Sequence, residues 1–177
     1  MADAYDGFRE FVAARRGALS RSAFFLAGSE SDAEDLLQDA LAKAAARWPR
    51  LRDQNPEAYV RQVMLNAVRS RWRRRQKISE QPTGDVPEGP SLGGPESDAV
   101  TKQLVPAALL RLTPRQRAVL WLRFYEDLSP VEAAPLLGCS VGTVKSQTHA
   151  ALARLRQVAP ELAPEPAPDR DETGVPE

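Results

Sequence analysis

The 177-residue sequence has very few of the side chains that bind metals or form cross-links. It contains a single cysteine, Cys139, and a single histidine, His149. One cysteine excludes an internal disulfide framework and a Cys-x-x-Cys zinc site, and one histidine excludes a histidine-pair metal site. We therefore predict that the protein is not an enzyme and that it holds no metal or other cofactor.

Long apolar runs are also missing. The uninterrupted apolar stretches are only a few residues long, far short of the roughly 20 residues that a membrane-spanning helix needs. The first residues, Met-Ala-Asp-Ala-Tyr-Asp, lack the basic region and apolar core of a secretion signal. We expect a cytoplasmic protein without membrane insertion.

Charge is balanced overall but unevenly distributed, because 24 basic and 24 acidic residues are segregated along the chain. Residues 1–77 and 104–158 carry a net positive charge, whereas 78–103 and 159–177 are acidic and rich in proline. Segments of the second kind bury too little apolar surface to offset the entropy of ordering. The pattern predicts two small domains, a flexible linker over 78–103 and a disordered tail over 159–177.

Both basic blocks are expected to be helical, which makes the predicted fold all-α. Isoleucine occurs once, and no alternation of apolar and polar residues is long enough for a strand. In the first block one helix ends near Gly28, a second opens with a capping box at Ser31, and a third is capped by Asn55. The buried stripe of the second helix is expected to run through Leu37, Leu41, Ala44 and Trp48.

The second block contains the spacing of a helix-turn-helix motif. Capping boxes begin at Thr113 and Ser129, Gly138 suits a left-handed helix end, and Ser140 caps a longer final helix. In the first of these helices the apolar face is expected to include Ala118, Val119, Leu122 and Tyr125. A helix-turn-helix motif places the first turns of its second helix in the major groove of DNA.

Polar residues of that final helix are candidates for DNA contacts. Lys145, Ser146 and His149 share a face on which they can reach base edges. The residues that flank this face and suit phosphate contacts are Thr143, Gln147, Arg154 and Arg156. An ordinary helical hairpin with a solvated polar face explains the same pattern.

The end of the third helix is strongly basic and includes an aromatic residue. Six cations surround Trp72, namely Arg69, Arg71, Arg73, Arg74, Arg75 and Lys77. Such a density of positive charge is suited to phosphate. One stripe of this helix combines an aromatic ring, two amides and cations, as binding of unpaired bases requires: Tyr59, Gln62, Asn66, Arg69 and Arg73. Taken alone, Tyr59 also fits a core position, and for Asn66 a tolerated polar residue is the favoured interpretation.

The second helix carries an acidic stripe formed by Asp35, Gln38 and Asp39. Paired carboxylates can be catalytic or bind metals, but no histidine, cysteine or glycine-rich phosphate loop accompanies these. A protein-docking face or a solvated face is the favoured interpretation.

Three stretches together resemble the extracytoplasmic-function (ECF) sigma factors of RNA polymerase, and more narrowly the actinobacterial SigE-like group. They read SDAEDLLQDALAKAAARW, AYVRQVMLNAVRSRWRRR and LTPRQRAVLWLRFYEDLSPVEAAPLLGCSVGTVKSQTHAALARLR. The resemblance extends from about Phe8 to Val158 and implies a protein that directs polymerase to promoters and opens the DNA.

The resemblance also implies a role for each segment. Residues 5–77 correspond to the sigma domain that docks on the β′ clamp helices and melts the -10 element, and residues 104–158 to the domain that reads the -35 element and meets the β flap. The docking helix matches at Asp35, Leu36, Gln38 and Asp39. The -10 helix matches at Tyr59, Gln62, Asn66, Arg69, Arg73 and Arg74, with Asn66 at the base-pocket position and Leu51–Asn55 as the specificity loop. An anti-sigma factor is an expected further partner.

Some positions depart from the wider family. Gln147 and Ala150 stand where arginine is frequent, and Pro106 lies where the second domain begins. Pro135 lies inside the first helix of the helix-turn-helix, where it removes a backbone donor. Two alternatives remain open at this point. One is a stand-alone helix-turn-helix regulator, and the other is a nucleic-acid enzyme with a carboxylate-metal site at Glu34, Asp35 and Asp39.

Overall fold

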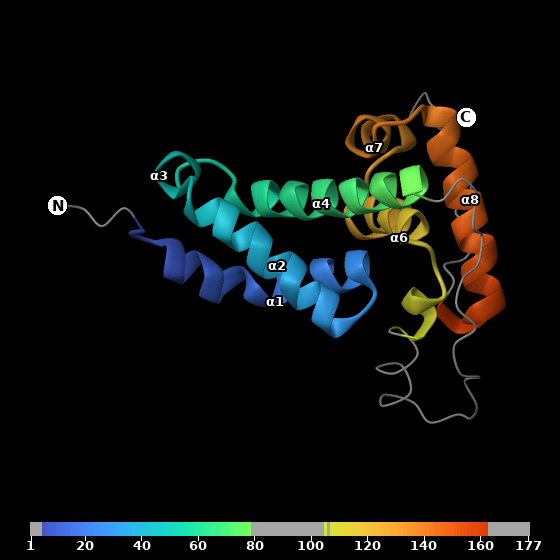
Figure 1. The fold of residues 1–177 in the computed structure, drawn as a ribbon, viewed down its shortest axis with the longest axis horizontal. Coiled ribbons are helices and arrows are strands. Elements are labelled where there is room, and N and C mark those ends of the chain that lie inside the picture. The colour runs from blue at the N-terminus through green and yellow to red at the C-terminus, as the bar shows by residue number, and fades with distance from the viewer. Residues whose placement is uncertain (1–4, 79–104, 106, 163–177) are drawn as a thin grey trace, which may run out of the picture.

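The computed structural model describes residues 5–78, 105 and 107–162, and within these ranges it consists of helices and short turns without a strand. The first bundle contains α1 (Phe8–Ala27), α2 (Glu30–Ala45), α3 (Trp48–Leu51) and α4 (Pro56–Ile78). The second contains α6 (Pro114–Leu120), the π-helical turn η1 (Trp121–Tyr125), α7 (Pro130–Leu137), α8 (Val141–Val158) and the 3-10 turn η2 (Pro160–Leu162). Figure 1 shows the bundles beside each other. The predicted all-α fold with two helical domains is confirmed, while the predicted linker from residue 79 onward, Pro106 and residues 163–177 lie outside the described residues.

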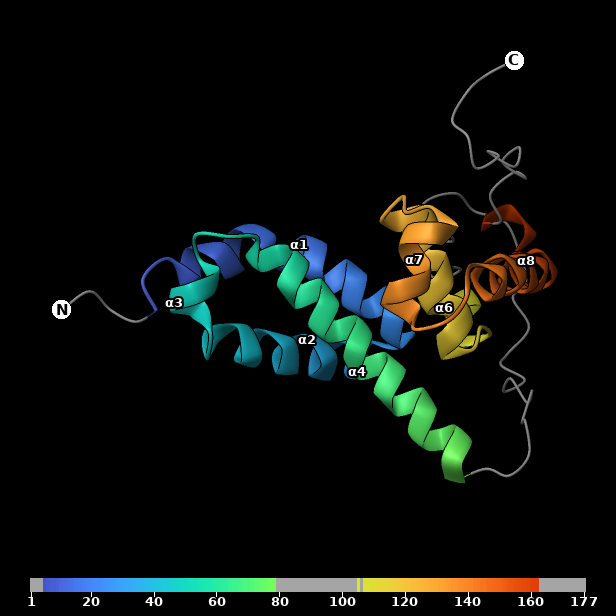
Figure 2. The ribbon, with the colours of Figure 1, turned by 90° about the horizontal axis from the view of Figure 1, so that it is seen from above.

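The first bundle is built on α1, α2 and α4, which pack on one another. Their facing sides contribute side chains that are at most 1% exposed, including Leu19, Leu26, Leu36, Ala40, Met64 and Leu65. Burial of this apolar surface is the main stabilising contribution to so small a unit. The faces of α2 and α4 that point away from this core lie on the outside of the bundle (Figure 2).

The end of α2 differs from the predicted course. The helix stops at Ala45, and Trp48 begins the separate helix α3 instead of extending the stripe of α2. Pro49 explains the break, because proline lacks the N–H that would continue α2 but is tolerated in the first turn of a new helix. Trp48 is still buried: its indole Nε1 donates to the carbonyl of Asp6 at 2.6 Å, and its ring meets Phe8 edge-on.

The start of α2 also differs, because Ser29 and not Ser31 is the N-cap. Ser29 has extended backbone angles, and its Oγ accepts a hydrogen bond from the N–H of Asp32 at 3.3 Å. Gly28 follows α1 with a left-handed φ of 88°, so only Gly28 and Ser29 separate the two helices. A cap must lie outside the helix it terminates, which excludes Ser31.

The other predicted helix boundaries are confirmed. The Oδ1 atom of Asn55 accepts from the N–H of Ala58 at 3.0 Å and caps α4. Thr113 and Ser129 form complete capping boxes, Gly138 ends α7 in the left-handed region, and Ser140 caps α8. The motif formed by α7 and α8 therefore has the expected helix-turn-helix order.

Two local features of the second bundle modify the sequence expectations. After Leu120 the helix widens into the π-helical turn η1, and Tyr125 is 39% exposed although its spacing predicted a buried residue. A π-helical turn changes the angle between successive side chains, so the 3.6-residue period no longer applies. Pro135 lies inside α7 without ending it, because the helix continues to Leu137.

The two bundles pack directly on each other through contacts of α1 and α4 with α6. Arg117 of α6 is 8% exposed, and its guanidinium reaches the carbonyl end of α1. The second bundle also extends past α8: Ala159 is fully buried, and Pro160–Leu162 turns back onto this helix. The first residues that the sequence assigns to the tail therefore belong to the folded unit.

Candidate nucleic-acid interface

The polar stripe on α4 is accessible along much of its length. Asn66 is exposed, and its Oδ1 accepts from Nε2 of Gln62 at 3.1 Å. Tyr59 is partly buried, with the guanidinium of Arg47 5.9 Å from its ring centre. An exposed amide, a partly exposed amide and an aromatic ring on one helix are suited to hydrogen bonding and stacking with an unpaired base.

The cations near the basic end of α4 include exposed side chains and one that is bound within the protein. Arg73 and Arg74 are exposed. Arg69, predicted to contact DNA, instead donates through Nη1 to the carbonyl of Leu136 at 2.7 Å. Trp72 lies under the guanidinium of Arg115 at 5.8 Å. Of the residues predicted for the -10 surface, Asn66, Arg73 and Arg74 are thus exposed, whereas Arg69 is engaged within the protein.

The acidic stripe on α2 points outward, with Asp35, Gln38 and Asp39 all exposed. Leu36, which was included in the same docking surface, is only 1% exposed and belongs to the core between the helices. The prediction for Leu36 is therefore wrong, because in the pattern it adjoins the stripe while in the fold it points away from it. The remaining three side chains form a compact acidic surface.

The second candidate reading surface lies on α8. Lys145, Ser146 and His149 are exposed, whereas Val144 between them and the bundle is fully buried. The N-terminal turn is fixed by Ser140, whose Oγ accepts from the N–H of Thr143 at 3.1 Å. This arrangement presents a short polar row at the start of a rigid helix, as reading of a DNA groove requires.

The flanking residues of α8 differ in their exposure and in their hydrogen bonds. Arg156 is exposed, and Gln147 is partly buried. Thr143 shares a 2.9 Å hydrogen bond with the Ser140 hydroxyl. Arg154 turns back toward its own bundle, where Nε lies 3.5 Å from the Arg111 carbonyl. A phosphate contact of Arg154 made with that carbonyl still bound would have to use its Nη atoms.

A cavity of about 650 Å³ adjoins the loop that leads into α4. Its lining residues come from the start of α1, from α3 and from the loop itself, including Asp6, Phe11, Trp48, Arg52, Asp53 and Asn55. The predicted specificity loop thus forms one wall of a recess at the end of the first bundle.

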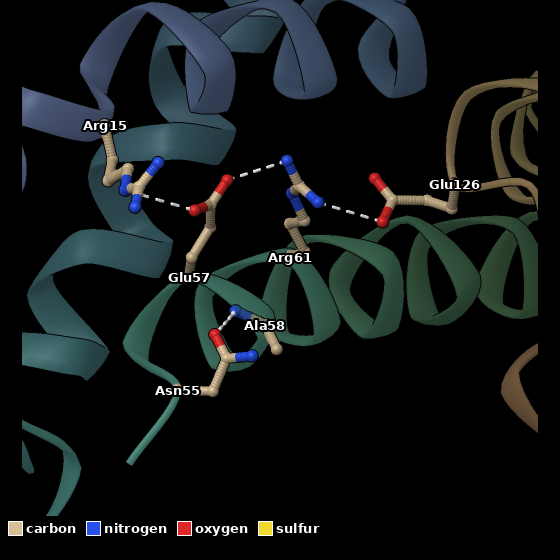
Figure 3. A network of polar contacts seen from close by, with 6 residues as sticks. All are labelled: Arg15, Asn55, Glu57, Ala58, Arg61 and Glu126. Carbon is tan, nitrogen blue, oxygen red and sulfur yellow. Dashed lines mark hydrogen bonds and ion pairs between the residues drawn. The ribbon is translucent and has the colours of Figure 1, made fainter. Parts of the chain in front are cut away.

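The sequence patterns did not predict the ion-pair chain that crosses from this recess to the second bundle (Figure 3). Glu57 binds Arg15 at 3.3 Å and Arg61 at 2.7 Å, and Arg61 also binds Glu126 at 2.9 Å. Burial raises the pKa of the Glu126 carboxyl above 4.5; Arg61 opposes this rise, and Glu57 adds to it. Only the Glu57–Arg61 link has a local signal, the i,i+4 spacing of a helical ion pair. Arg61 and Glu126 are 65 residues apart, so no local spacing signals their contact.

In the described part of the chain, no group of three or more histidine, cysteine, aspartate or glutamate side chains is arranged to hold a metal ion. No helix in those ranges is long and apolar enough to cross a membrane.

Comparison with known families gives one match over each bundle. The family described as Sigma-70 region 2 matches residues 11–78, and the one described as Sigma-70, region 4 matches residues 102–155. The first match disfavours a stand-alone helix-turn-helix regulator, which would need only the second bundle.

Similar individual proteins lead to the same family. The RNA polymerase sigma-E factor of Streptomyces coelicolor is 45% identical over 151 residues, which cover 85% of this chain and 84% of that protein. The sigma-E factor of Streptomyces avermitilis is 43% identical over 151 residues, covering 85% and 83%. The sigma factor RpoE of Bartonella quintana, solved with the anti-sigma factor NepR, matches with a TM-score of 0.55 and 27% identity over 85% of this chain and 95% of that one. With both sigma regions in order and curated relatives matched over most of their length, the chain belongs to the ECF sigma factors of RNA polymerase, in the sigma-E-like group.

Proposed function

We propose that this sigma factor binds core RNA polymerase through α2, reads a -10 element with α4 and a -35 element with α8, and opens the promoter. The main support is that two exposed polar reading faces, around Asn66 and around Lys145, lie on separate bundles of one chain. A factor that reads two separated elements needs such a division.

The α4 surface is proposed to bind the melted -10 strand. Extracting a base from the stack costs a few kcal/mol, which stacking and hydrogen bonding to the extruded base must offset. Asn66 and Gln62 provide amide hydrogen bonds, and Tyr59 provides an aromatic ring. Arg73 and Arg74 follow on the same helix, where they can neutralise the phosphates of the bound strand.

The α8 surface is proposed to enter the major groove at the -35 element. Lys145, Ser146 and His149 face outward at its N-terminal end, where a helix-turn-helix motif approaches base edges. Thr143, Gln147 and Arg156 flank this row at positions suited to the DNA backbone.

The acidic surface of Asp35, Gln38 and Asp39 is proposed to dock on the β′ clamp helices, and the second bundle to meet the β flap. Exposed carboxylates on a rigid helix favour a basic partner surface and accelerate its encounter. The protein itself is proposed to catalyse no reaction and to act in the cytoplasm, at the nucleoid, through the polymerase. Because RpoE of Bartonella quintana was solved with NepR, an anti-sigma factor is a proposed regulator here too.

Co-purification with bacterial core polymerase tests this function. We expect wild-type protein to bind stoichiometrically and an Asp35→Arg, Asp39→Arg double variant to lose binding. The matched control is Glu10→Arg, Glu161→Arg, which makes the same charge change at two exposed carboxylates away from α2 and should bind normally. Failure of folded wild-type protein to bind would refute the proposal, and equal loss in both double variants would refute the assigned surface.

A further inference from the structure

An arginine outside α4 lies against the face that is proposed to bind the -10 strand. The Cζ atom of Arg47 lies over the Tyr59 ring, 5.9 Å from the ring centre. Arg47 directly precedes α3, whereas Tyr59 lies in the first turn of α4, and both segments are at the same end of the first bundle (Figure 1). The aromatic end of the α4 stripe therefore includes a cation from a different segment.

The backbone at Arg47 is held on both sides. Its N–H donates to the carbonyl of Ala44 at 3.0 Å, and its carbonyl accepts from the N–H groups of Arg50 at 3.0 Å and Leu51 at 3.2 Å. The next residue, Trp48, is 3% exposed and donates through its indole Nε1 to the carbonyl of Asp6. The Arg47 side chain thus starts from a fixed point, which reduces the ordering cost when its guanidinium binds a ligand.

The positive charge of Arg47 is not neutralised within the described part of the protein. Its side chain is exposed, and none of the ion pairs found among the described residues involves it. Arg15 and Arg61, by contrast, both pair with Glu57. An incoming anion at Arg47 would therefore have no carboxylate partner to displace.

A guanidinium over an aromatic ring is well suited to bind phosphate. It can meet the ring with its flat face, while its five N–H donors point outward in the plane of the group. Two of these donors can bind the oxygens of one phosphate at the same time. The Tyr59 ring would then hold the fork in place without using its donors.

The aromatic end of the stripe also needs a cation of its own. The exposed Arg73 lies 14 residues after Tyr59 on α4, which is about 21 Å at a rise of 1.5 Å per residue. A nucleotide that packs on Tyr59 is therefore far from the basic end of the helix. Arg47 places a positive charge where that nucleotide's phosphates would lie.

We propose that Arg47 binds a phosphate of the melted -10 strand beside the base that packs on Tyr59, with the Tyr59 ring holding the guanidinium in place. This inference rests on the proposed role of α4 in binding that strand. It adds to the reading surface a residue that the stripe on α4 does not contain.

Equilibrium binding of a fluorescein-labelled single strand by the reconstituted holoenzyme tests this contact. The strand is the non-template -10 segment of the mapped promoter, and its affinity is measured at several salt concentrations. Loss of one phosphate contact to a single strand reduces the slope of log K against log salt by about 0.7. Arg47→Met should show this smaller slope and bind about tenfold more weakly at low salt.

The matched control is Arg16→Met, which removes the same charge at an exposed arginine of α1. Arg15 pairs with Glu57 of α4, and the next residue of a helix points about 100° away, so Arg16 faces another direction. Arg16→Met should leave affinity and slope unchanged. Arg47→Lys keeps the charge without the planar fork, so it should keep the slope and recover only part of the affinity.

Substitutions of Tyr59 test whether its ring holds the guanidinium. Tyr59→Phe keeps the ring and should preserve the full effect of Arg47→Met. Tyr59→Leu removes the ring, and in this background the effect of Arg47→Met should shrink by about threefold. Co-purification with core polymerase verifies that each variant is assembled.

Two results would overturn the phosphate contact. One is an Arg47→Met holoenzyme with the affinity and slope of Arg16→Met, and the other is weaker binding with an unchanged slope, as expected of a residue that only supports Tyr59. Asn66→Ala in the same assay separates this failure from that of the proposed function. Weaker binding by Asn66→Ala with normal binding by Arg47→Met would reject Arg47 alone, whereas normal binding by both would also reject strand binding on α4.

Discussion

The Nη2 atom of Arg117 donates a 2.8 Å hydrogen bond to the carbonyl of Ala27, which lies 90 residues earlier at the end of α1. The same guanidinium serves carbonyls of its own bundle, so one buried side chain satisfies the ends of two helical segments in different sigma regions. Gly28 leaves room for it: a Cβ there would lie 2.9 Å from the Arg117 Cζ. Stability and the relative placement of the two regions are therefore coupled at this side chain.

Removal of the Arg117 guanidinium should destabilise the protein strongly. Arg117→Met leaves buried carbonyls without their donors, and we expect the free energy of unfolding in urea to fall by about 3 kcal/mol or more. Arg156→Met, at an exposed arginine of α8, should change it by less than about 0.5 kcal/mol. Similar values for the two variants would contradict the role of Arg117.

Gly28, which caps α1, and Gly17, inside that helix, should respond in opposite ways to alanine. Gly28→Ala forces a side chain into a left-handed conformation at φ 88° and against Arg117, so unfolding should become easier by about 1–2 kcal/mol. Gly17→Ala lies inside the helix, where its Cβ would meet only Arg21 Nη1 at 3.6 Å. Gly17→Ala should raise the free energy of unfolding by about 0.5–1 kcal/mol. Thermal unfolding of the two variants shows whether each one gains or loses stability.

The cap of α2 offers a comparison between two neighbouring serines. Ser29→Ala removes the oxygen that accepts from the Asp32 N–H and should lower the free energy of unfolding by about 1 kcal/mol. Ser31 lies in the first turn of α2, and Ser31→Ala should change the free energy of unfolding by less than about 0.5 kcal/mol. Urea unfolding distinguishes them, and a larger effect at Ser31 would restore the cap expected from the sequence.

Glu126 should make stability depend on pH in an unusual direction. Because burial raises the pKa of its carboxyl above 4.5 in the folded state, its contribution is fully present below 4.5 and is lost as pH rises through the folded pKa. The unfolding free energy of Glu126→Gln relative to wild type should therefore increase as pH is raised from about 4 to 7. A constant difference over that range would contradict the raised pKa.

Glu132 provides the opposite case within the same bundle. Hydrogen bonds from the side chain and backbone of Ser129 lower the pKa of its carboxyl. The resulting stability is present above 4.5 and is lost as pH falls through the folded pKa. Glu132→Gln should thus lose stability relative to wild type mainly above 4.5, and the two glutamine variants should diverge in opposite directions in the same titration.

The proposed melting function makes a prediction at Asn66. In a holoenzyme reconstituted on its mapped promoter, Asn66→Ala should reduce permanganate reactivity of the unpaired -10 thymines by about tenfold, through loss of contacts to the extruded base. Polymerase binding should be unchanged, because Asn66 lies on α4 away from the acidic surface of α2. Gln157→Ala, an exposed amide on α8, is the control. Normal melting by Asn66→Ala would remove this residue from the proposed pocket.

Local signals in the sequence were sufficient for most helix boundaries and for the order of the two regions. Each capping side chain accepts from an N–H three residues later, so the sequence pattern around it already contains its partner. These caps are Asn55, Thr113, Ser129 and Ser140. The same holds for the exposed rows around Asn66 and Lys145, whose spacing along a helix sets which side chains share a face.

The tertiary structure alone decided what those faces meet. Leu36 adjoins an acidic stripe in sequence but packs inward, and Arg69 matches a DNA-contact position but binds the Leu136 carbonyl of the other bundle. The chain of Arg61 and Glu126 and the anchoring of Arg117 on α1 likewise join segments far apart in sequence. A short capping side chain reaches only its own turn of helix, whereas burial and the long guanidinium side chains depend on which surfaces the fold brings together.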